Sequence, residues 1–247
     1  AFARNHAAAD GIELGEVGLN LKTVLKKKDK VVSQLTGGVG MLVKKRGIEQ
    51  VTGSATLQAD KSILVKTEGG ETRIQATHTI LATGSVAVEL PFLPFDGETI
   101  VSSDEAIAFE TVPEKLVVIG AGAIGLELGS VWSRYGSEVT VVEFLPKVAA
   151  GYDDDVSKHL ERSLKKQGLN FHTNTKVTGV RKTDGQLIVV AEKKGKEMTL
   201  PADKVLVAVG RKPYSAGLGL ENIGLATNER GQVETSKDFE TSVTGIY

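Results

Sequence analysis

The sequence predicts an α/β fold built on a parallel sheet that is covered on both faces. From residue 115 onward, short apolar runs alternate with helical patterns, which is the order of a βαβ chain. A glycine-rich turn at 120–125 lies directly between one such run and one such helix. Ahead of this part, residues 86–114 hold three of the six prolines, and we expect them to form a connector between domains rather than a core.

The composition limits the partners that the chain can be expected to bind. Its 247 residues are 40% hydrophobic and 25% charged, with a formal net charge of −1. This balance gives no electrostatic drive toward nucleic acid or a membrane surface, and no apolar run reaches the roughly 18–20 residues of a membrane span. We therefore expect no nucleic-acid and no membrane partner. Cysteine is absent and the four histidines are scattered, so we expect no disulfide and no metal site.

Residues 18–46 carry apolar side chains at helical spacing and predict one long amphipathic helix with Asn20 as its N-cap. The lysine run at 26–28 could bind phosphate, but a solvated helix face is the favoured interpretation. The glycines of TGGVG at 36–40 could form a phosphate loop, but no strand precedes them. We expect them to be small residues at a close helix contact instead.

The pattern changes at residue 48 to short alternating segments, IEQVTG, SATLQA, SILVKTE and ETRIQA, with turn residues between them. This predicts a β-meander over 48–82. The meander leads into THTILATGS at 77–85, which we predict to be a buried strand ending at a glycine. The chain closes on ETSVTGIY at 240–247, which reads as the opening of another strand.

The part from residue 115 predicts elements in βαβ order. Strands are expected at 115–120, 137–143, 169–173 and 202–210. Helices are expected at 123–136 and at 153–168, the second opened by Asp153. A second meander is expected at about 176–200. Apolar strands in this order belong to a parallel sheet.

The turn Gly120-x-Gly122-x-x-Gly125 is the motif that carries chemistry. A glycine pattern alone is weak evidence, but here a strand precedes it and a helix follows it, as dinucleotide binding requires. Gly120 permits the tight turn, Gly122 lets a pyrophosphate approach the backbone, and Gly125 lets helix and strand pack closely. The pattern predicts a Rossmann-like dinucleotide-binding domain with the pyrophosphate at the helix N-terminus.

Glu143 ends the second strand of this unit, near the expected distance of about 20 residues from the glycine turn. A carboxylate there accepts hydrogen bonds from ribose hydroxyls, each worth about 1.5–3 kcal/mol. A 2′-phosphate would instead meet a like charge, at a cost of up to about 4 kcal/mol at 4 Å and an effective dielectric of about 20. Both effects favour NAD over NADP.

The motifs ILATGS, VVIGAGAIGLELGSVWSRYG, VTVVE, NTKVTG, VLVAVGRKP and SVTGIY occur in an order that resembles the flavin-dependent pyridine nucleotide–disulfide oxidoreductases. The resemblance covers essentially the whole chain and is strongest to the members that reoxidise dihydrolipoamide with NAD. It implies a Rossmann-like NAD-binding domain inserted into part of a second, FAD-binding Rossmann-like domain. Residues 1–112 would belong to the FAD-binding domain, 113–235 would form the NAD-binding domain, and 236–247 would return to the FAD-binding domain.

The resemblance also implies cofactor contacts at matching positions. The pyrophosphate would be held by Gly120, Gly122, Ala123, Ile124 and Gly125. Glu127 would lie near the nicotinamide end, and Glu143 at the ribose. Val177 and Gly210 would line the adenosine and nicotinamide sides of the pocket. Gly53 and the turn of Thr83, Gly84 and Ser85 match positions that contact FAD.

An enzyme of this kind would use FAD and NAD and form a homodimer. It would serve a lipoyl-bearing acyltransferase of a 2-oxo acid dehydrogenase complex, in the bacterial cytoplasm or the mitochondrial matrix. The family's redox-active cysteine pair, its His-Glu base and its flavin-binding aspartate have no match in this sequence. We therefore expect an internal piece of such an enzyme and assign no catalytic residue. The alternative is a stand-alone NAD-binding module without catalysis.

Overall fold

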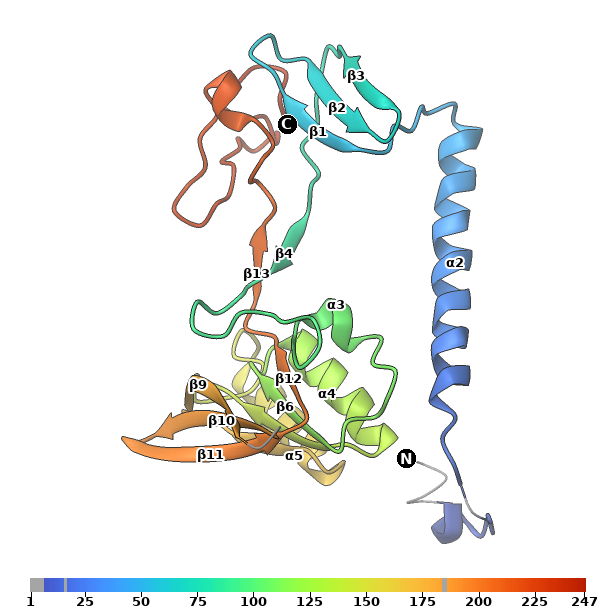
Figure 1. Ribbon diagram of the computed structural model, residues 1–247, viewed down its shortest axis with the longest axis vertical. Coiled ribbons are helices and arrows are strands. Elements are labelled where there is room, and N and C mark those ends of the chain that lie inside the picture. The colour runs from blue at the N-terminus through green and yellow to red at the C-terminus, as the bar shows by residue number, and fades with distance from the viewer. Residues whose placement is uncertain (1–6, 16, 184–185) are drawn as a thin grey trace. The chain divides into compact units, whose positions relative to one another are not determined.

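The computed structural model describes residues 7–15, 17–183 and 186–247, and the chain divides into two compact units (Figure 1). The first unit holds Ala1–Asp29 and Ala87–Gly210, and the second holds Lys30–Val86 and Arg211–Tyr247. These limits differ from the predicted boundaries at 112 and 235. The reason is burial, because 87–112 supply core residues to the first unit and 211–235 supply Leu220 and Leu225 to the core of the second.

A five-stranded parallel sheet of order β5-β12-β6-β7-β8 forms the centre of the first unit. Its strands in that order are β5 (Ile100–Val101), β12 (Lys204–Val207), β6 (Lys115–Ile119), β7 (Glu138–Val142) and β8 (Asn170–His172). Val118 of β6 lies opposite Leu206 on one side and Val141 on the other. All three side chains are fully buried, as expected for strands covered on both faces.

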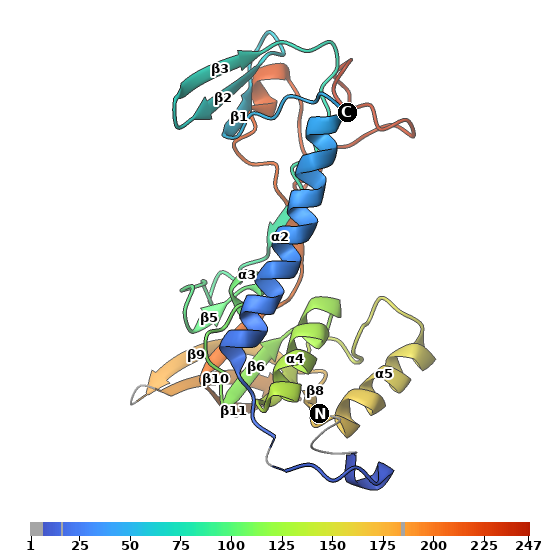
Figure 2. The ribbon, with the colours of Figure 1, turned by 90° about the vertical axis from the view of Figure 1, so that its right-hand side faces the viewer.

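Helices cover one face of this sheet and an antiparallel sheet covers the other (Figure 2). The helical face carries α3 (Ser103–Ala106), α4 (Ala123–Tyr135) and α5 (Asp154–Lys166). The second face carries β9 (Lys176–Thr183), β10 (Gln186–Lys193) and β11 (Lys196–Ala202). Side chains alternate along β6, since Val118 packs with the helices and Val117 with β10. The predicted α/β class and the order of its elements are confirmed.

The two long helices of this unit end and begin where the sequence signals predict. α4 stops at Gly136, whose φ of 118° is left-handed and whose N–H donates to Trp132 O. α5 starts after Asp153, whose carboxylate accepts hydrogen bonds from the backbone N–H of Asp155 at 2.8 Å and of Val156 at 3.4 Å. The end of α4 and the start of α5 are therefore each fixed by a local capping interaction.

Residues 86–114 are more than a connector, which corrects the prediction made from their prolines. Val101, Ala106 and Phe109 are buried in the core under α4, and 100–101 form the edge strand β5. α3 begins with a capping box formed by Ser102 and Glu105. The Glu105 carboxylate accepts hydrogen bonds from Ser102 N and Ser102 Oγ, and the Ser102 side chain in turn accepts from the backbone of the first turn. Proline content predicted exposure here, but apolar residues between the prolines decide the packing.

The second unit contains the predicted meander with one strand fewer than expected. β1 (Ser54–Leu57), β2 (Ile63–Thr67) and β3 (Gly70–Ile74) pair antiparallel in sequence order. The first predicted segment, 48–53, is not a strand, and Ile48 is exposed. Two short strands, β4 (Ser85–Ala87) and β13 (Arg211–Pro213), pair with each other. A small core beneath the meander contains Leu57, Leu220 of the 3-10 helix η2 (Leu220–Ile223), Leu225 and Ile246.

The predicted buried strand at 77–85 is wrong for the part of the chain that the structure describes. Residues 77–84 form a single parallel bridge, Thr79 to Ile246, supported by backbone bonds of Thr79 and Leu81 to the last residues of the chain, and Ser85 alone belongs to a strand, β4. Ile80 is 75% exposed. A buried strand needs neighbours along both edges and cover on both faces, and this segment has one short neighbour.

The long helix α2 (Leu21–Lys45) confirms the prediction for 18–46, with Asn20 Oδ1 accepting from Thr23 N at 3.0 Å. It runs unbroken through the glycines at 36–40 (Figure 2). The predicted close contact at these glycines is wrong among the described residues, because a Cβ on Gly37, Gly38 or Gly40 would meet nothing within 4 Å. A further short 3-10 helix, η1 (Ala7–Asp10), precedes α2.

Candidate dinucleotide-binding site

The glycine turn lies at the carboxyl end of β6, at the start of α4, and two of its glycines are fixed by packing. Gly120 has φ of 101°, and a Cβ there would lie 2.5 Å from Ala208 O. A Cβ on Gly125 would clash with Gly120 O and press on Val118. Both positions therefore need glycine so that β6, β12 and α4 can approach one another.

Gly122 differs, because the space beside it is open. Within the described part of the chain, no atom lies within 4 Å of the place that a Cβ would occupy, and the φ of −78° at Gly122 is accessible to any residue. Gly122 is also the N-cap of α4 and offers no side chain to the first-turn N–H groups. These amides, with the positive end of the helix dipole, are left available for an anion that reaches the open side of Gly122.

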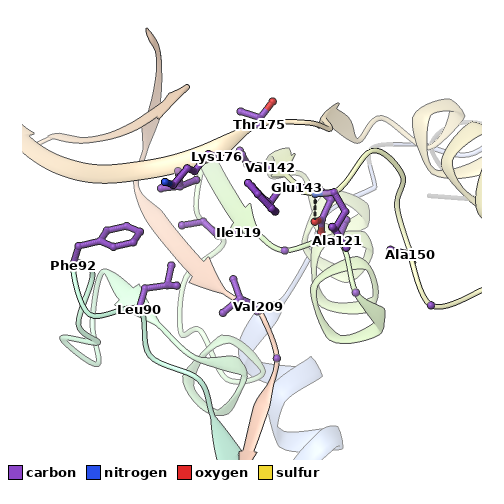
Figure 3. Close-up of a pocket in the computed structure, with 18 residues that line it drawn as sticks. Leu90, Phe92, Ile119, Ala121, Val142, Glu143, Ala150, Thr175, Lys176 and Val209 are labelled. Atoms are coloured by element: carbon purple, nitrogen blue, oxygen red, sulfur yellow. Dashed lines mark hydrogen bonds between the residues drawn. The ribbon is translucent and has the colours of Figure 1, made fainter. Parts of the chain in front are cut away.

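A cavity of about 610 Å³ opens at this point, at the carboxyl ends of the parallel strands (Figure 3). Gly120, Ala121 and Gly122 form one part of its lining. Val177 at the start of β9 and Gly210 after β12 form others, so the structure brings these two predicted residues to the glycine turn. In open α/β sheets, this edge is where ligands bind.

Glu143 enters the same cavity from the end of β7. Its Oε2 accepts a hydrogen bond from Ala121 N at 2.6 Å, drawn dashed in Figure 3, and its Oε1 accepts one from Leu145 N at 2.7 Å. Its backbone is fixed as well, since Glu143 N donates to His172 O. The carboxylate is thus held against the glycine turn, and each oxygen keeps a second lone pair for another donor.

Apolar side chains make up much of the remaining lining. Phe144 and Leu145 follow Glu143, and Leu90 and Phe92 come from the segment after β4. Phe144 is 67% exposed and Phe92 48%, so both present ring surface to solvent at the cavity. Sequence reasoning missed Leu90 and Phe92 because it treated their proline-rich segment as a linker. The apolar residues of LPFLPF were the available signal.

Four residues predicted near the dinucleotide lie on α4 and do not line this cavity: Ala123, Ile124, Gly125 and Glu127. Ala123 and Glu127 line a second cavity of about 310 Å³ between α4 and α5, together with Tyr152 and Val156. Glu127 is exposed there. Ile124 is half-buried in the first turn of α4.

The residues that match FAD-contacting positions lie in the second unit. Thr83 and Gly84 line a cavity of about 190 Å³, and Thr83 Oγ1 donates to Tyr214 O at 2.6 Å. Ser85 Oγ accepts from Arg211 Nε at 2.8 Å and does not line that cavity. Gly53 lies against the β2 backbone at Lys66, where a Cβ would clash, so packing alone accounts for a glycine there.

Other chemistry finds little support in the described residues. His172 lies on β8, beside β7. Burial, with a smaller effect of Lys193, lowers the pKa of the His172 ring below its usual range, which favours its neutral form. Among the described residues, no three His, Cys, Asp or Glu side chains come together as a metal site would require. Within the same residues, no helix is long and apolar enough to cross a membrane.

Comparison with known proteins adds a family. The model described as pyridine nucleotide-disulphide oxidoreductase matches residues 3–247. The chain is 48% identical over 240 residues to a dihydrolipoamide dehydrogenase of Chaetomium thermophilum, covering 96% of this chain and 48% of that protein. It is 44% identical to a mitochondrial dihydrolipoyl dehydrogenase of Dictyostelium discoideum, covering 96% of this chain and 50% of the relative.

The solved structures agree on the fold. LpdA from Mycobacterium tuberculosis superposes with a TM-score of 0.89 at 22% identity, covering 99% of this chain and 53% of that one. At this identity the likeness establishes the fold alone. The chain spans about half the length of the curated relatives it matches.

Proposed function

The chain belongs to the pyridine nucleotide-disulphide oxidoreductase family, and we propose on that basis that its first unit binds NAD in the cavity at the glycine turn. One observation carries this proposal. The open side of Gly122 and the carboxylate of Glu143 line the same cavity, with Ala121 N bonded directly to that carboxylate. An anion site and a hydroxyl-binding site at a fixed separation suit a pyrophosphate joined to a ribose.

Each part of the cavity has a task in this proposal. The N–H groups at the start of α4 bind the pyrophosphate, in the space that Gly122 leaves open. Glu143 accepts hydrogen bonds from the adenosine ribose hydroxyls and repels a 2′-phosphate. Phe144 and Leu145 shield the adenosine from water. Val177 and Gly210 line other parts of the cavity. When bound, NAD supplies a two-electron acceptor.

The second unit would contribute part of an FAD site. Thr83, Gly84 and Ser85 form a turn in which Gly84 has φ of 71°, and the first two line a cavity. Gly84 adds no side chain there, so a ligand can reach the backbone closely. The clash at Gly53 explains that glycine by packing, so Gly53 adds no support to the FAD site.

The whole protein would be an NAD-dependent dihydrolipoyl dehydrogenase that carries FAD. This activity rests on the relatives named above, together with the match of Gly120–Gly125, Glu143 and Gly210 to a dinucleotide site. A homodimer that acts on the lipoyl-bearing acyltransferase of a 2-oxo acid dehydrogenase complex follows from that activity. The mitochondrial matrix fits the Dictyostelium relative, and a bacterial cytoplasm is the other expected location. In this proposal the chain supplies NAD binding and part of the FAD site.

Titration of Glu143 variants with NADH and NADPH tests the ribose assignment. Glu143→Ala should weaken NADH binding about 10- to 100-fold, because it removes at least one charged hydrogen bond worth about 1.5–3 kcal/mol. NADPH binding should change much less, since the variant also removes a repulsion. Glu143→Gln should reduce the ratio of NADH affinity to NADPH affinity, while its amide oxygen still offers an acceptor to Ala121 N.

Glu138→Ala provides the matched control, because Glu138 is an exposed glutamate at the opposite end of β7. It should leave both affinities unchanged. Equal losses of NADH and NADPH affinity in Glu143→Gln would show that Glu143 does not read the ribose. A wild-type protein that binds neither nucleotide would contradict the dinucleotide site as a whole.

A further inference from the structure

The loop that joins β7 to α5 forms one wall of the dinucleotide cavity. From this loop, the cavity is lined by Glu143, Phe144, Leu145, Ala150 and Gly151. Lys147 lies in the middle of the same loop but is not part of that lining. What fixes the conformation of the loop therefore decides the shape of the wall, and Lys147 can affect a ligand only through the loop.

The loop touches the glycine turn at Ala149. Ala149 N donates to Ala121 O at 2.8 Å, and Ala149 and the preceding Val148 are both buried. Ala149 has φ of 47°, which costs a residue with a Cβ about 1–2 kcal/mol relative to ordinary helical backbone. Such a conformation persists only where the surroundings hold it in place.

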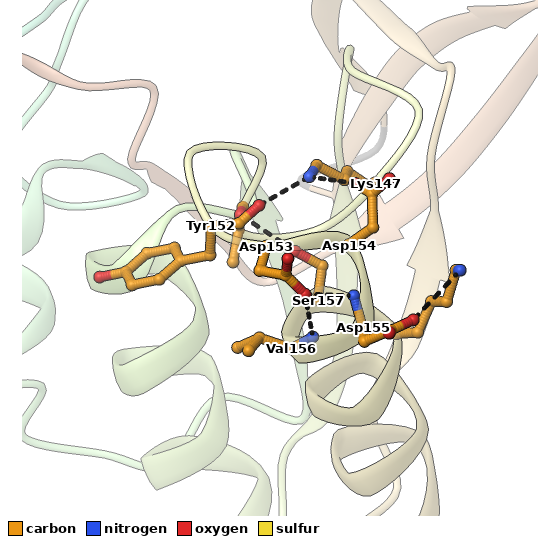
Figure 4. A network of polar contacts seen from close by, with 9 residues as sticks. Lys147, Tyr152, Asp153, Asp154, Asp155, Val156 and Ser157 are labelled. Carbon is orange, nitrogen blue, oxygen red and sulfur yellow. Dashed lines mark hydrogen bonds and ion pairs between the residues drawn. The ribbon is translucent and has the colours of Figure 1, made fainter.

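The surroundings that hold Ala149 form a polar network (Figure 4). Ala149 O accepts from Tyr152 N at 2.9 Å and from Ser157 Oγ at 3.2 Å. The Lys147 ammonium donates to Tyr152 O at 2.7 Å and pairs with Asp154 Oδ1 at 2.6 Å. The Lys147 side chain is only 31% exposed. It thus joins the residues before Ala149 to those after it and to the start of α5.

The charges in this network are matched to one another. The Lys147 hydrogen bond, together with its positive charge, holds the pKa of Asp154 below its usual range, so the Asp154 carboxylate stays ionised at neutral pH. Asp154 also lies in the first turn of α5, where the helix dipole favours a carboxylate. The Lys147 ammonium therefore bonds to one acceptor in its own loop, Tyr152 O, and to one at the start of α5, the Asp154 carboxylate, and it is not directed toward a ligand.

Resting on the NAD-binding function proposed above, we propose that Lys147 is a positioning residue for the dinucleotide. Its ammonium keeps Ala149 N against Ala121 O in the free protein, and so sets the glycine turn and the Leu145–Gly151 wall before a ligand arrives. Without it, the loop must be ordered at the moment of binding, and that entropy is subtracted from the affinity.

Calorimetric titration of the purified protein with NADH, NADPH and ADP-ribose tests this role. Lys147→Ala should weaken both NADH and ADP-ribose about tenfold, through the ordering cost. Lys147→Arg, which can reach the same two acceptors, should recover most of the affinity. The matched control is Lys158→Ala. Lys158 is an exposed lysine of α5 that pairs with Asp155 of the same helix, and its replacement should leave the affinities for NADH and ADP-ribose unchanged.

Hydrogen exchange separates positioning from general destabilisation. In Lys147→Ala, amides of 145–152 should exchange faster in the free protein and return toward wild-type rates with NADH bound, while β6 and β12 stay protected. Unchanged NADH affinity in Lys147→Ala would overturn the proposal, as would faster exchange throughout the sheet. A loss confined to NADPH would overturn it too, since it would make Lys147 a phosphate ligand. If wild-type protein bound neither NADH nor ADP-ribose, the NAD-binding function would fail first and this role with it.

Discussion

The glycines at 120 and 122 serve different physical ends, and alanine at each should separate them. Gly122→Ala should lower the free energy of unfolding by only about 0.5–1 kcal/mol, the cost of alanine at an N-cap, because its Cβ meets no atom of the described residues and its φ is ordinary. It should weaken NADH binding tenfold or more, about 1.4 kcal/mol, because the Cβ enters the pyrophosphate space. Gly120→Ala should lower the free energy of unfolding by about 2 kcal/mol, from its positive φ and its clash with Ala208 O.

Thermal unfolding and NADH titration of the two variants check this pair of expectations. Gly122→Ala binding NADH as well as the wild type would show that no phosphate approaches the turn there. A Gly122→Ala protein that loses as much stability as Gly120→Ala would show instead that the open space is filled in solution.

Ser137 carries a buried polar atom without a partner among the residues that the structure describes. It follows the C-cap of α4, is buried, and its Oγ makes no hydrogen bond to any of those residues. Ser137→Ala removes that desolvated hydroxyl and keeps the backbone bond to Trp132 O. We expect the free energy of unfolding to rise by about 1 kcal/mol, measured by denaturant titration. A clear loss of stability would show that Oγ has a partner in solution.

At the scale of elements, the loop before β5 is organised around one carboxylate. Burial opposes ionisation of Asp96, but hydrogen bonds from Thr99 Oγ1 and from the N–H groups of Ile100, Glu98 and Thr99 outweigh it and lower its pKa to about 2. Because the folded pKa lies below the usual 3.8, the ionised loop stabilises the fold above about pH 4, and this contribution is lost as pH falls toward 2.

The stability difference between wild type and Asp96→Ala should therefore depend on pH. It should be largest and constant above about pH 5, and should narrow steadily below pH 4. Denaturant unfolding at several pH values between 7 and 3 measures it. A difference that stays constant down to pH 3 would mean that Asp96 has an ordinary pKa in the folded protein.

Elements with a complete local pattern could be predicted from the sequence, and elements that depend on distant neighbours could not. β6, α4 and β7 follow from apolar runs, a glycine turn and a C-cap glycine within one stretch of chain. Residues 77–84 also contain an apolar run, Ile80–Ala82, but they have only one neighbour, so they form a bridge in place of a strand. Val101 and Phe109 are core residues, although the prolines of their segment led us to predict a connector there.

The same distinction applies to the candidate site. Gly120, Gly122, Glu143, Val177 and Gly210 could be predicted because each stands next to a recognisable strand end, and all of them line one cavity. Leu90 and Phe92 reach that cavity from a segment far away in sequence. The bonds of Lys147 to Tyr152 and Asp154 depend on a loop conformation that no sequence pattern specifies.

At the scale of the whole molecule, the two units have different relations to the proposed function. The first unit has a packed three-layer core, and its candidate site is made entirely of its own residues. The second unit has a smaller core and a small cavity at Thr83 and Gly84. NAD binding can therefore be tested on the first unit's residues without any assumption about the FAD site.

A crystal structure of the protein soaked or grown with NADH would show where the dinucleotide binds. We expect the pyrophosphate to lie against the N–H groups that follow Gly122, within hydrogen-bond distance, and a ribose hydroxyl to bond to a Glu143 carboxylate oxygen. NADH ordered at another place, or bound in this cavity with Glu143 turned away from the ribose, would contradict this expectation.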